Sequence, residues 1–118
     1  MTQEEKQLLI KDLCVRFPYG VICRLSAKDA DVSITEKLDI GGIEHFIYGT
    51  MNVEPYLRPM SSMTDEEIDR MWEIYESGPA AESSVAVTEY LYERHLDCHY
   101  LIEKRLALEA PEGMYKTK

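Results

Sequence analysis

Hydrophobic residues near the start of the chain recur with the period of a helix. They are spaced three and four residues apart and form one apolar stripe: Ile10, Leu13, Cys14 and Phe17. Thr2 and Glu5 have the spacing of a capping box, which satisfies free backbone N–H groups at a helix start. Pro18 and Gly20 follow the stripe and stop a helix. The first segment is therefore predicted to be a helix that ends before Pro18.

The period then changes to that of extended chain. Residues 21–25 form a short apolar run, and residues 32–40 contain the alternation expected of a strand. The two glycines at 41 and 42 permit positive φ and suit a hairpin turn, so residues 43–48 are predicted as the returning strand. Residues 52–57 are a candidate fourth strand. We expect a small antiparallel sheet of three to four strands.

The next helical pattern is the strongest in the chain. Thr64 and Glu67 form a second capping box, and Gly78 with Pro79 ends the helix. The apolar positions in between again follow helical spacing: Ile68, Met71, Trp72 and Tyr75. A stripe of this kind is usually buried, so we expect it to pack on the sheet with Trp72 in the core. An exposed aromatic interface around Trp72 is the alternative.

Two further helices complete the prediction. One begins near residues 83–84 and runs to about His95. Asp97 caps a short fourth helix that carries the apolar residues Leu101, Ile102, Leu106 and Leu108. Helices packed on one face of an antiparallel sheet make this an α+β fold. We expect one domain over residues 1–113 and a flexible C-terminal tail over residues 114–118.

The balance of charges narrows the range of partners. The 118 residues include 13 basic and 22 acidic ones, which gives a net charge of −9. This charge repels polyanions, and the basic residues form no patch along the sequence, so we expect no direct binding to nucleic acid. An acidic surface can instead engage a basic protein, or it can imitate nucleic acid.

The cysteines and the first residues indicate the compartment. Cys14, Cys23 and Cys98 are odd in number and contain no C-x-x-C pair, so we expect buried free thiols and no disulfide framework. The polar, acidic start lacks the features of a signal peptide. No apolar run approaches the roughly 20 residues of a membrane span. The expected location is a reducing cytoplasm, without membrane contact.

Residue types that ligate metals or act as nucleophiles gather at His95, Asp97, Cys98 and His99. On a continuous helix, His95 and His99 would share a face at a spacing that can chelate a transition metal. Cys98 beside His99 could form a thiolate–imidazole pair. However, a structural zinc site usually has four ligands in paired spacing, and Asp97 is a good helix cap that would break the shared face. We therefore expect no metal, cofactor or catalytic residue. A small metal protein or enzyme built on these four residues, with Glu103, is the alternative.

The segment between Pro55 and Pro59 is the candidate for partner contacts. Each proline disfavours helix for the residue before it, and conformationally restrained segments with an aromatic and an arginine often contact partners. Tyr56 and Arg58 are the candidates for such contacts. The interpretation that we favour is packing, in which Tyr56 and Leu57 fill the edge of the core and Arg58 pairs with an acidic helix.

Three stretches, residues 8–21, 55–64 and 95–110, carry a family resemblance. They include the runs L-C-V-R-F-P-Y-G-V, P-Y-L-R-P-M-S-S-M-T and L-I-E-K-R-L-A-L-E-A. Together they resemble a group of small proteins from gut Bacteroidetes and their phages or integrated elements. The resemblance implies a shared fold and origin, and it implies no activity, cofactor or catalytic residue. The group usually has an aromatic and then a basic residue where this chain has Cys98 and His99, so a site built on these two would be peculiar to this sequence.

The sequence contains no convergent set of acid, base, nucleophile or phosphate-binding residues. This favours a non-enzymatic protein-binding or accessory protein of a phage or mobile element. Two alternatives stay open. One is the metal protein or enzyme at residues 95–99, and the other is an acidic DNA mimic that inhibits a nucleic-acid-binding protein. The sequence leaves the oligomeric state undetermined.

Overall fold

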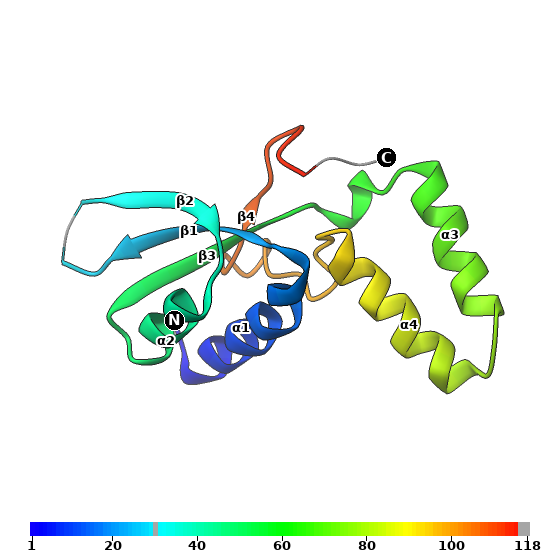
Figure 1. Ribbon diagram of the computed structural model, residues 1–118, viewed down its shortest axis with the longest axis horizontal. Coiled ribbons are helices and arrows are strands. Elements are labelled where there is room, and N and C mark those ends of the chain that lie inside the picture. The colour runs from blue at the N-terminus through cyan, green and yellow to red at the C-terminus, as the bar shows by residue number, and fades with distance from the viewer. Residues whose placement is uncertain (30, 116–118) are drawn as a thin grey trace.

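A computed structural model describes residues 1–29 and 31–115, and it confirms the predicted α+β fold (Figure 1). Four α-helices and a four-stranded sheet make up this part of the chain. The helices are α1 (Gln3–Arg16), α2 (Ile40–Ile47), α3 (Asp65–Glu76) and α4 (Ala80–Glu93). The strands are β1 (Ile22–Ala27), β2 (Ser33–Lys37), β3 (Met51–Leu57) and β4 (Leu108–Glu109). Short 3-10 helices lie at Phe17–Tyr19 and Met60–Ser62.

The sheet has the strand order β2-β1-β3-β4. The first two pairings are antiparallel, with Cys23 opposite Pro55 in the β1–β3 ladder, and the β3–β4 pairing is parallel. Helices α1 and α2 lie on the same side of the sheet (Figure 1). Buried residues alternate along β3 as Val53, Pro55 and Leu57. The core cluster lies between the sheet, these two helices and the chain after α4: Leu9, Leu13, Val21, Cys23, Leu25, Leu38, Phe46, Val53, Leu57, Leu101, Leu106 and Ala107.

The predicted strand over residues 43–48 is wrong, because this segment is helix α2. Asp39 is its N-cap, and the Asp39 carboxylate accepts a hydrogen bond from the Gly42 backbone N–H at 2.7 Å. A Cβ on Gly42 would lie 3.1 Å from Leu38 Cδ1 and 3.5 Å from Leu25 Cδ2 of β1, so glycine leaves room for these side chains between α2 and the sheet. Gly42 therefore serves close packing here, and no hairpin turn forms at the two glycines.

Helices α3 and α4 form a hairpin that projects from one end of the molecule (Figure 1). The projection makes the protein elongated, at 49 × 29 × 24 Å. Its radius of gyration is 15.1 Å, against about 13 to 14 Å for a compact chain of this length. The expectation that α3 packs its apolar stripe on the sheet is wrong. The core cluster of the described residues contains no residue of either helix, and α3 packs on α4 instead.

The predicted fourth helix after Asp97 is also absent from the described residues. Residues 97–105 form successive turns, with positive φ at Tyr100 and Arg105. Asp97 does act as a cap, because its carboxylate accepts hydrogen bonds from the Leu101 and Ile102 backbone N–H groups at 2.8 and 3.0 Å. The chain then forms β4.

Tyr115, within the segment expected to be a flexible tail, contacts the sheet. The Tyr115 phenol is half-buried, and its hydroxyl accepts a hydrogen bond from the Ile22 N–H and donates one to the Tyr56 carbonyl, each at 2.8 Å. It joins β1 and β3 just beyond the last pair of their ladder, Cys23 with Pro55. Residues 116–118 lie outside the described part of the chain. None of the described helices is long and apolar enough to cross a membrane.

Candidate functional site

The α3–α4 hairpin exposes large apolar side chains that helical spacing alone would place in a core. Trp72 is 52% exposed and Tyr75 46% exposed, and their rings meet edge to face with centroids 5.7 Å apart. With Met71 and Val87 these two residues line an open groove of about 320 Å³ between the two helices. We call the exposed surface formed by Ile68, Trp72 and Tyr75 the aromatic face of the hairpin. The preference for Trp72 in the core is overturned, and the alternative of an exposed aromatic surface holds.

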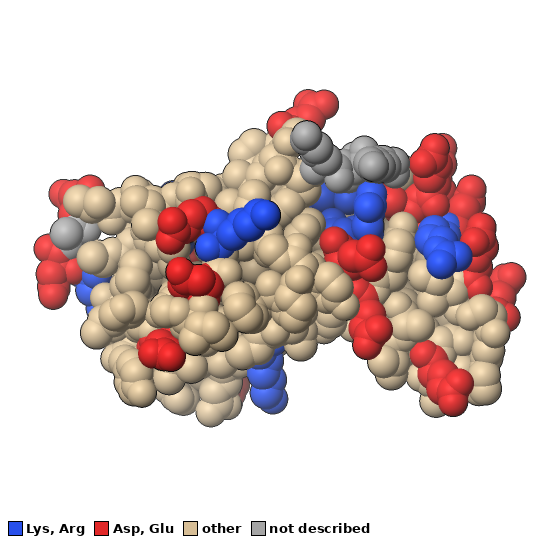
Figure 2. Space-filling view, in the orientation of Figure 1, with Lys and Arg blue, Asp and Glu red and all other residues tan. Residues whose placement is uncertain are grey.

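The hairpin also carries most of the protein's charge. Nine acidic residues and a single basic one, Arg70, lie between Asp65 and Glu93, so this segment holds a net −8 of the chain's −9. Figure 2 shows acidic side chains spread over the hairpin, next to neutral surface. Apolar side chains bordered by carboxylates thus form one continuous arm of the molecule.

A buried ion network fixes the hairpin at its base. Both oxygens of the Glu67 carboxylate accept hydrogen bonds from Arg58, at 2.7 and 2.8 Å, and Oε2 accepts another from Arg94 Nε at 2.8 Å. Glu67 also completes the α3 capping box by accepting from the Thr64 N–H. Hydrogen bonds from Arg58, opposed by burial and aided by Thr64 and Arg94, lower the pKa of Glu67 to about 2. The carboxylate is therefore ionised and ties β3 to the start of α3 and the end of α4.

This geometry decides between the two readings of Arg58. The side chain is buried, and it spends its donors on Glu67 and on the Ser62 and Arg94 carbonyls. Its position matches the favoured interpretation, in which Arg58 pairs with an acidic helix, and it is not placed as a surface contact. Tyr56 is half-buried within β3, which corresponds to the candidate strand over residues 52–57.

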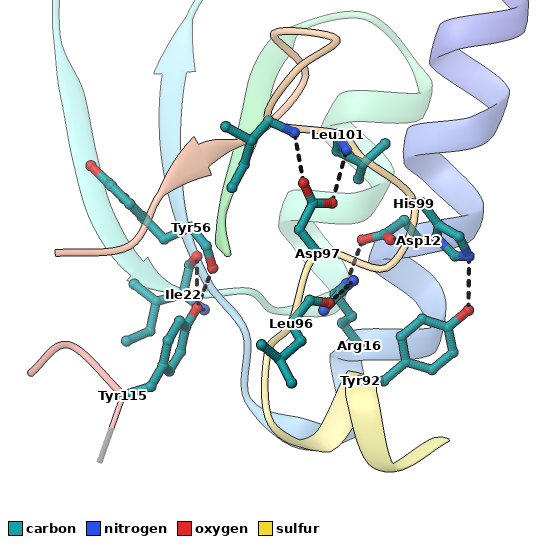
Figure 3. Close-up of polar contacts among 11 residues, drawn as sticks. Asp12, Arg16, Ile22, Tyr56, Tyr92, Leu96, Asp97, His99, Leu101 and Tyr115 are labelled. Atoms are coloured by element: carbon teal, nitrogen blue, oxygen red, sulfur yellow. Dashed lines mark hydrogen bonds and ion pairs between the residues drawn. The ribbon is translucent and has the colours of Figure 1, made fainter. Parts of the chain in front are cut away.

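A second buried network joins α1 to the chain after α4 (Figure 3). Asp12 and Arg16 are both fully buried and pair at 2.7 Å, and Arg16 Nη2 donates to the Leu96 carbonyl at 2.7 Å. Asp12 Oδ2 lies 2.9 Å from His99 Nδ1, and His99 Nε2 lies 3.2 Å from the Tyr92 hydroxyl. A carboxylate can only accept, so Nδ1 is the donor. The network holds the loop after α4 against α1.

The four candidate ligands at residues 95–99 point in different directions. His95 has positive φ just beyond α4 and stacks on the Tyr115 ring at 3.8 Å, whereas His99 faces Asp12. Asp97 is occupied by backbone N–H groups. The shared helix face expected for His95 and His99 is therefore absent. Within residues 1–29 and 31–115 no three His, Cys, Asp or Glu side chains come together in a way that could hold a metal ion.

The cysteines show no sign of activation. Burial raises the pKa of Cys23 to about 12 and also raises the pKa of Cys98. Both ring nitrogens of His99 have other partners, so the thiolate–imidazole pair of Cys98 and His99 does not form. Cys14 is exposed on α1, contrary to the expectation that all three thiols are buried.

A second open groove lies on the other side of α4. Its volume is about 500 Å³, and Val15, Tyr19, Val85 and Tyr92 contribute to its walls. The Arg16 guanidinium lies over the Tyr92 ring, 5.1 Å from its centroid, and burial raises the pKa of the phenol. Helix α4 is thus bordered by apolar grooves on two sides.

Sequence reasoning missed the Asp12–Arg16 pair, and it named an acidic helix as the partner of Arg58 without identifying Glu67. Asp12 and Arg16 stand four residues apart, a spacing that places them on one helix turn, and this signal was present in the sequence. The partners of Glu67 are 9 and 27 residues away, so no local pattern reveals them. Comparisons with protein-family models, curated proteins and solved structures find no match for this chain.

Proposed function

We propose that the protein acts by binding another protein through the α3–α4 hairpin. The observation that carries this proposal is the pair Trp72 and Tyr75, half-exposed on an arm that contributes no residue to the core cluster. Aromatic side chains are enriched at protein interfaces and at the residues that carry most of their binding energy. Contiguous exposed apolar surface with a polar rim is typical of such sites.

The charge of the hairpin specifies the chemistry of the partner. A net charge of −8 on this arm fits a positively charged surface and disfavours an acidic one. We propose a basic surface that contains an apolar pocket for Trp72. The carboxylates would speed the encounter, and the aromatic face would slow dissociation.

The rigid base of the hairpin suits this role. Glu67, Arg58 and Arg94 hold both helices where they leave the sheet, so the aromatic face is presented in one orientation before binding. A preorganised surface loses less conformational entropy when it binds. The family resemblance adds a setting, in which the partner is a protein of the host of a phage or mobile element.

Imitation of nucleic acid is a second candidate function. It is favoured by the eight carboxylates between Asp65 and Glu93 other than the buried Glu67, which could occupy a surface that otherwise receives phosphates. In that case the partner is a nucleic-acid-binding protein, and duplex DNA competes with the hairpin for it.

Photo-crosslinking from defined positions tests the proposal. We would replace Tyr75 by a benzophenone-bearing amino acid and irradiate the protein in a lysate of the source cells. Tyr48, which is 79% exposed at the end of α2, provides the matched control position. We expect a discrete cross-linked protein from position 75 and not from position 48, lost in Trp72→Ser and weakened by salt.

The results separate the two candidates and can overturn both. Equal products from positions 75 and 48, or products that survive Trp72→Ser, would show that the hairpin is not the binding surface. Added duplex DNA would abolish the cross-link for a nucleic-acid mimic. A cross-link that persists with DNA bound to the same partner would leave only the first function.

A further inference from the structure

A small crevice lies beside the base of the hairpin, apart from the aromatic face. Its volume is about 240 Å³. Basic side chains from three separate parts of the chain line it: Lys37 at the end of β2, Arg58 just after β3, and Arg94 with His95 after α4. Figure 2 shows basic side chains where the hairpin meets the body, in a protein whose hairpin is otherwise acidic. The crevice concentrates positive charge in a protein of net charge −9.

Hydrogen-bond donors remain available in this crevice. Arg94 uses Nε for Glu67, and its terminal nitrogens make no hydrogen bond within the described chain. The same holds for Lys37 Nζ. Arg58, in contrast, is saturated by Glu67 and two carbonyls. The donors that can reach a ligand are thus those of Lys37 and Arg94.

Two buried nitrogens without a partner lie at the same end of α4. They are Arg16 Nη1 and His95 Nδ1, and no other buried side-chain polar atom in residues 1–29 and 31–115 lacks one. Arg16 Nη2 donates to the carbonyl of Leu96, the residue after His95, which brings the two groups into the same region. An unpaired buried polar atom costs free energy, so its presence needs a physical reason.

The charges around His95 are unbalanced in the positive sense. Arg16, Arg58 and Arg94 surround it, whereas two buried carboxylates, Asp12 and Glu67, pair with them. Burial, together with the positive charges of the three arginines, lowers the pKa of His95 to about 4. Glu93 is the acidic residue that lines the crevice, and the Tyr115 ring covers the imidazole on one side.

We propose that this crevice binds a small oxyanion of the size of phosphate, held by Lys37 and Arg94 beside His95. Oxyanions accept several hydrogen bonds, and guanidinium and ammonium groups are their usual protein donors. The volume of about 240 Å³ is below the usual range of sites for larger organic ligands, which favours an ion of this size. With Lys37, four cations stand against the three carboxylates of Asp12, Glu67 and Glu93, and the anion offsets this excess of positive charge.

The histidines provide a direct readout. We would follow the imidazole protons of His45, His95 and His99 by NMR as a function of pH, with sodium phosphate and with sodium chloride at equal ionic strength. A bound phosphate stabilises the charged imidazole, so we expect the pKa of His95 to rise. His45 lies exposed on α2, and the chemical shifts of its ring protons should be the same in both salts.

Two substitutions with opposite expected effects sharpen the test. Lys37→Met removes a cation and should weaken phosphate binding about two- to five-fold, whereas Glu93→Gln removes a carboxylate and should strengthen it by a similar factor. Lys11→Met, an exposed change on α1, should leave the affinity unchanged. Arg58 and Arg94 are left intact because they hold Glu67. Equal responses of His45 and His95 to phosphate, or equal affinities in the Lys37 and Lys11 variants, would overturn the proposal.

Discussion

The body of the protein and its α3–α4 hairpin are stabilised by different means. In the body, apolar residues of α1, α2 and the sheet pack into one cluster that excludes water. In the hairpin, the two helices touch mainly each other, and a buried ion network at their base joins them to β3. Hydrophobic burial, with the buried Asp12–Arg16 pair, therefore holds the body together, whereas charge pairing alone positions the base of the hairpin and leaves its aromatic face exposed.

This difference in stabilisation explains how one small chain can keep an apolar surface exposed to solvent and still fold. If apolar contacts held the base of the hairpin, the aromatic face could replace them by packing against the body. The ion pairs of Glu67 with its two arginines are directional, so they fix one orientation of the hairpin. Buried ion pairs add little net stability but can specify geometry, and we infer that role here.

The largest expected effect follows from removing the centre of the network. Glu67→Ala leaves Arg58 and Arg94 buried without their counter-ion, so we expect a loss of about 3–5 kcal/mol in the free energy of unfolding. Urea denaturation measures it. Glu66→Ala, at an exposed neighbouring position, should change stability by less than about 0.5 kcal/mol. A Glu67 variant as stable as the Glu66 variant would show that the network is not what holds the hairpin.

A comparable loss is expected in the body from a purely apolar change. Leu13 is fully buried in α1, and Leu13→Ala should lower the free energy of unfolding by about 2–5 kcal/mol through lost burial and a cavity. The two variants should differ in amide hydrogen exchange. Glu67→Ala should raise exchange chiefly in α3 and α4, and Leu13→Ala should raise it in the sheet. Identical exchange patterns would mean that body and hairpin form one cooperative unit.

The loss of stability at low pH reports on the same carboxylate, that of Glu67. The pKa of Glu67 is lowered from 4.5 to about 2, so its stabilisation is complete above pH 4.5 and is lost as the pH falls towards 2. The shift corresponds to roughly 3 kcal/mol at most. Denaturation at a series of pH values in wild type and in Glu67→Gln gives the difference. If both proteins lose stability in parallel between pH 4.5 and 2, the lowered pKa is refuted.

The titration of His95 should give a separate and smaller change in the free energy of unfolding, at higher pH than that of Glu67. Its pKa falls from 6.5 to about 4 in the folded protein, so protons bind the unfolded chain first. Stability is therefore highest above pH 6.5 and declines as the pH falls towards 4, by roughly 1–3 kcal/mol. The measurement is unfolding in chloride buffers. His95→Phe keeps a ring against Tyr115 and should remove this step, and a step that persists would belong to another group.

The parts of this fold that could be predicted depend on residues close together in the chain. The capping boxes at Thr2 and Thr64 are confirmed, because each needs only residues three apart. The strand at residues 52–57 is confirmed as β3. The prediction of a strand over residues 43–48 was wrong because paired glycines suit both a hairpin turn and a helix that packs closely on its neighbours. Which of the two forms depends on contacts with Leu38 and with Leu25, which is distant in the sequence.

The candidate site depends even more on residues that are distant in the sequence, so less of it could be predicted. The pattern of Ile68, Met71, Trp72 and Tyr75 correctly predicts an amphipathic helix, but periodicity says nothing about what covers its apolar face. Whether α3 packs on α4 or on the sheet depends on residues outside α3. The charge network that enforces this arrangement joins residues 9 to 36 positions apart.

The smallest effect on stability is expected from a substitution on the aromatic face, and it tests the comparison of body and hairpin most directly. Trp72 is the single tryptophan of the chain, and Trp72→Ser should change the free energy of unfolding by less than about 1 kcal/mol because the side chain is already half in water. Its fluorescence in the folded wild type should be quenched efficiently by neutral acrylamide. Quenching by cesium should exceed quenching by iodide, since the net charge of −8 on the hairpin attracts cations and repels anions. Emission protected from acrylamide, with a loss of several kcal/mol in Trp72→Ser, would place the indole in a core and remove the distinction between body and hairpin.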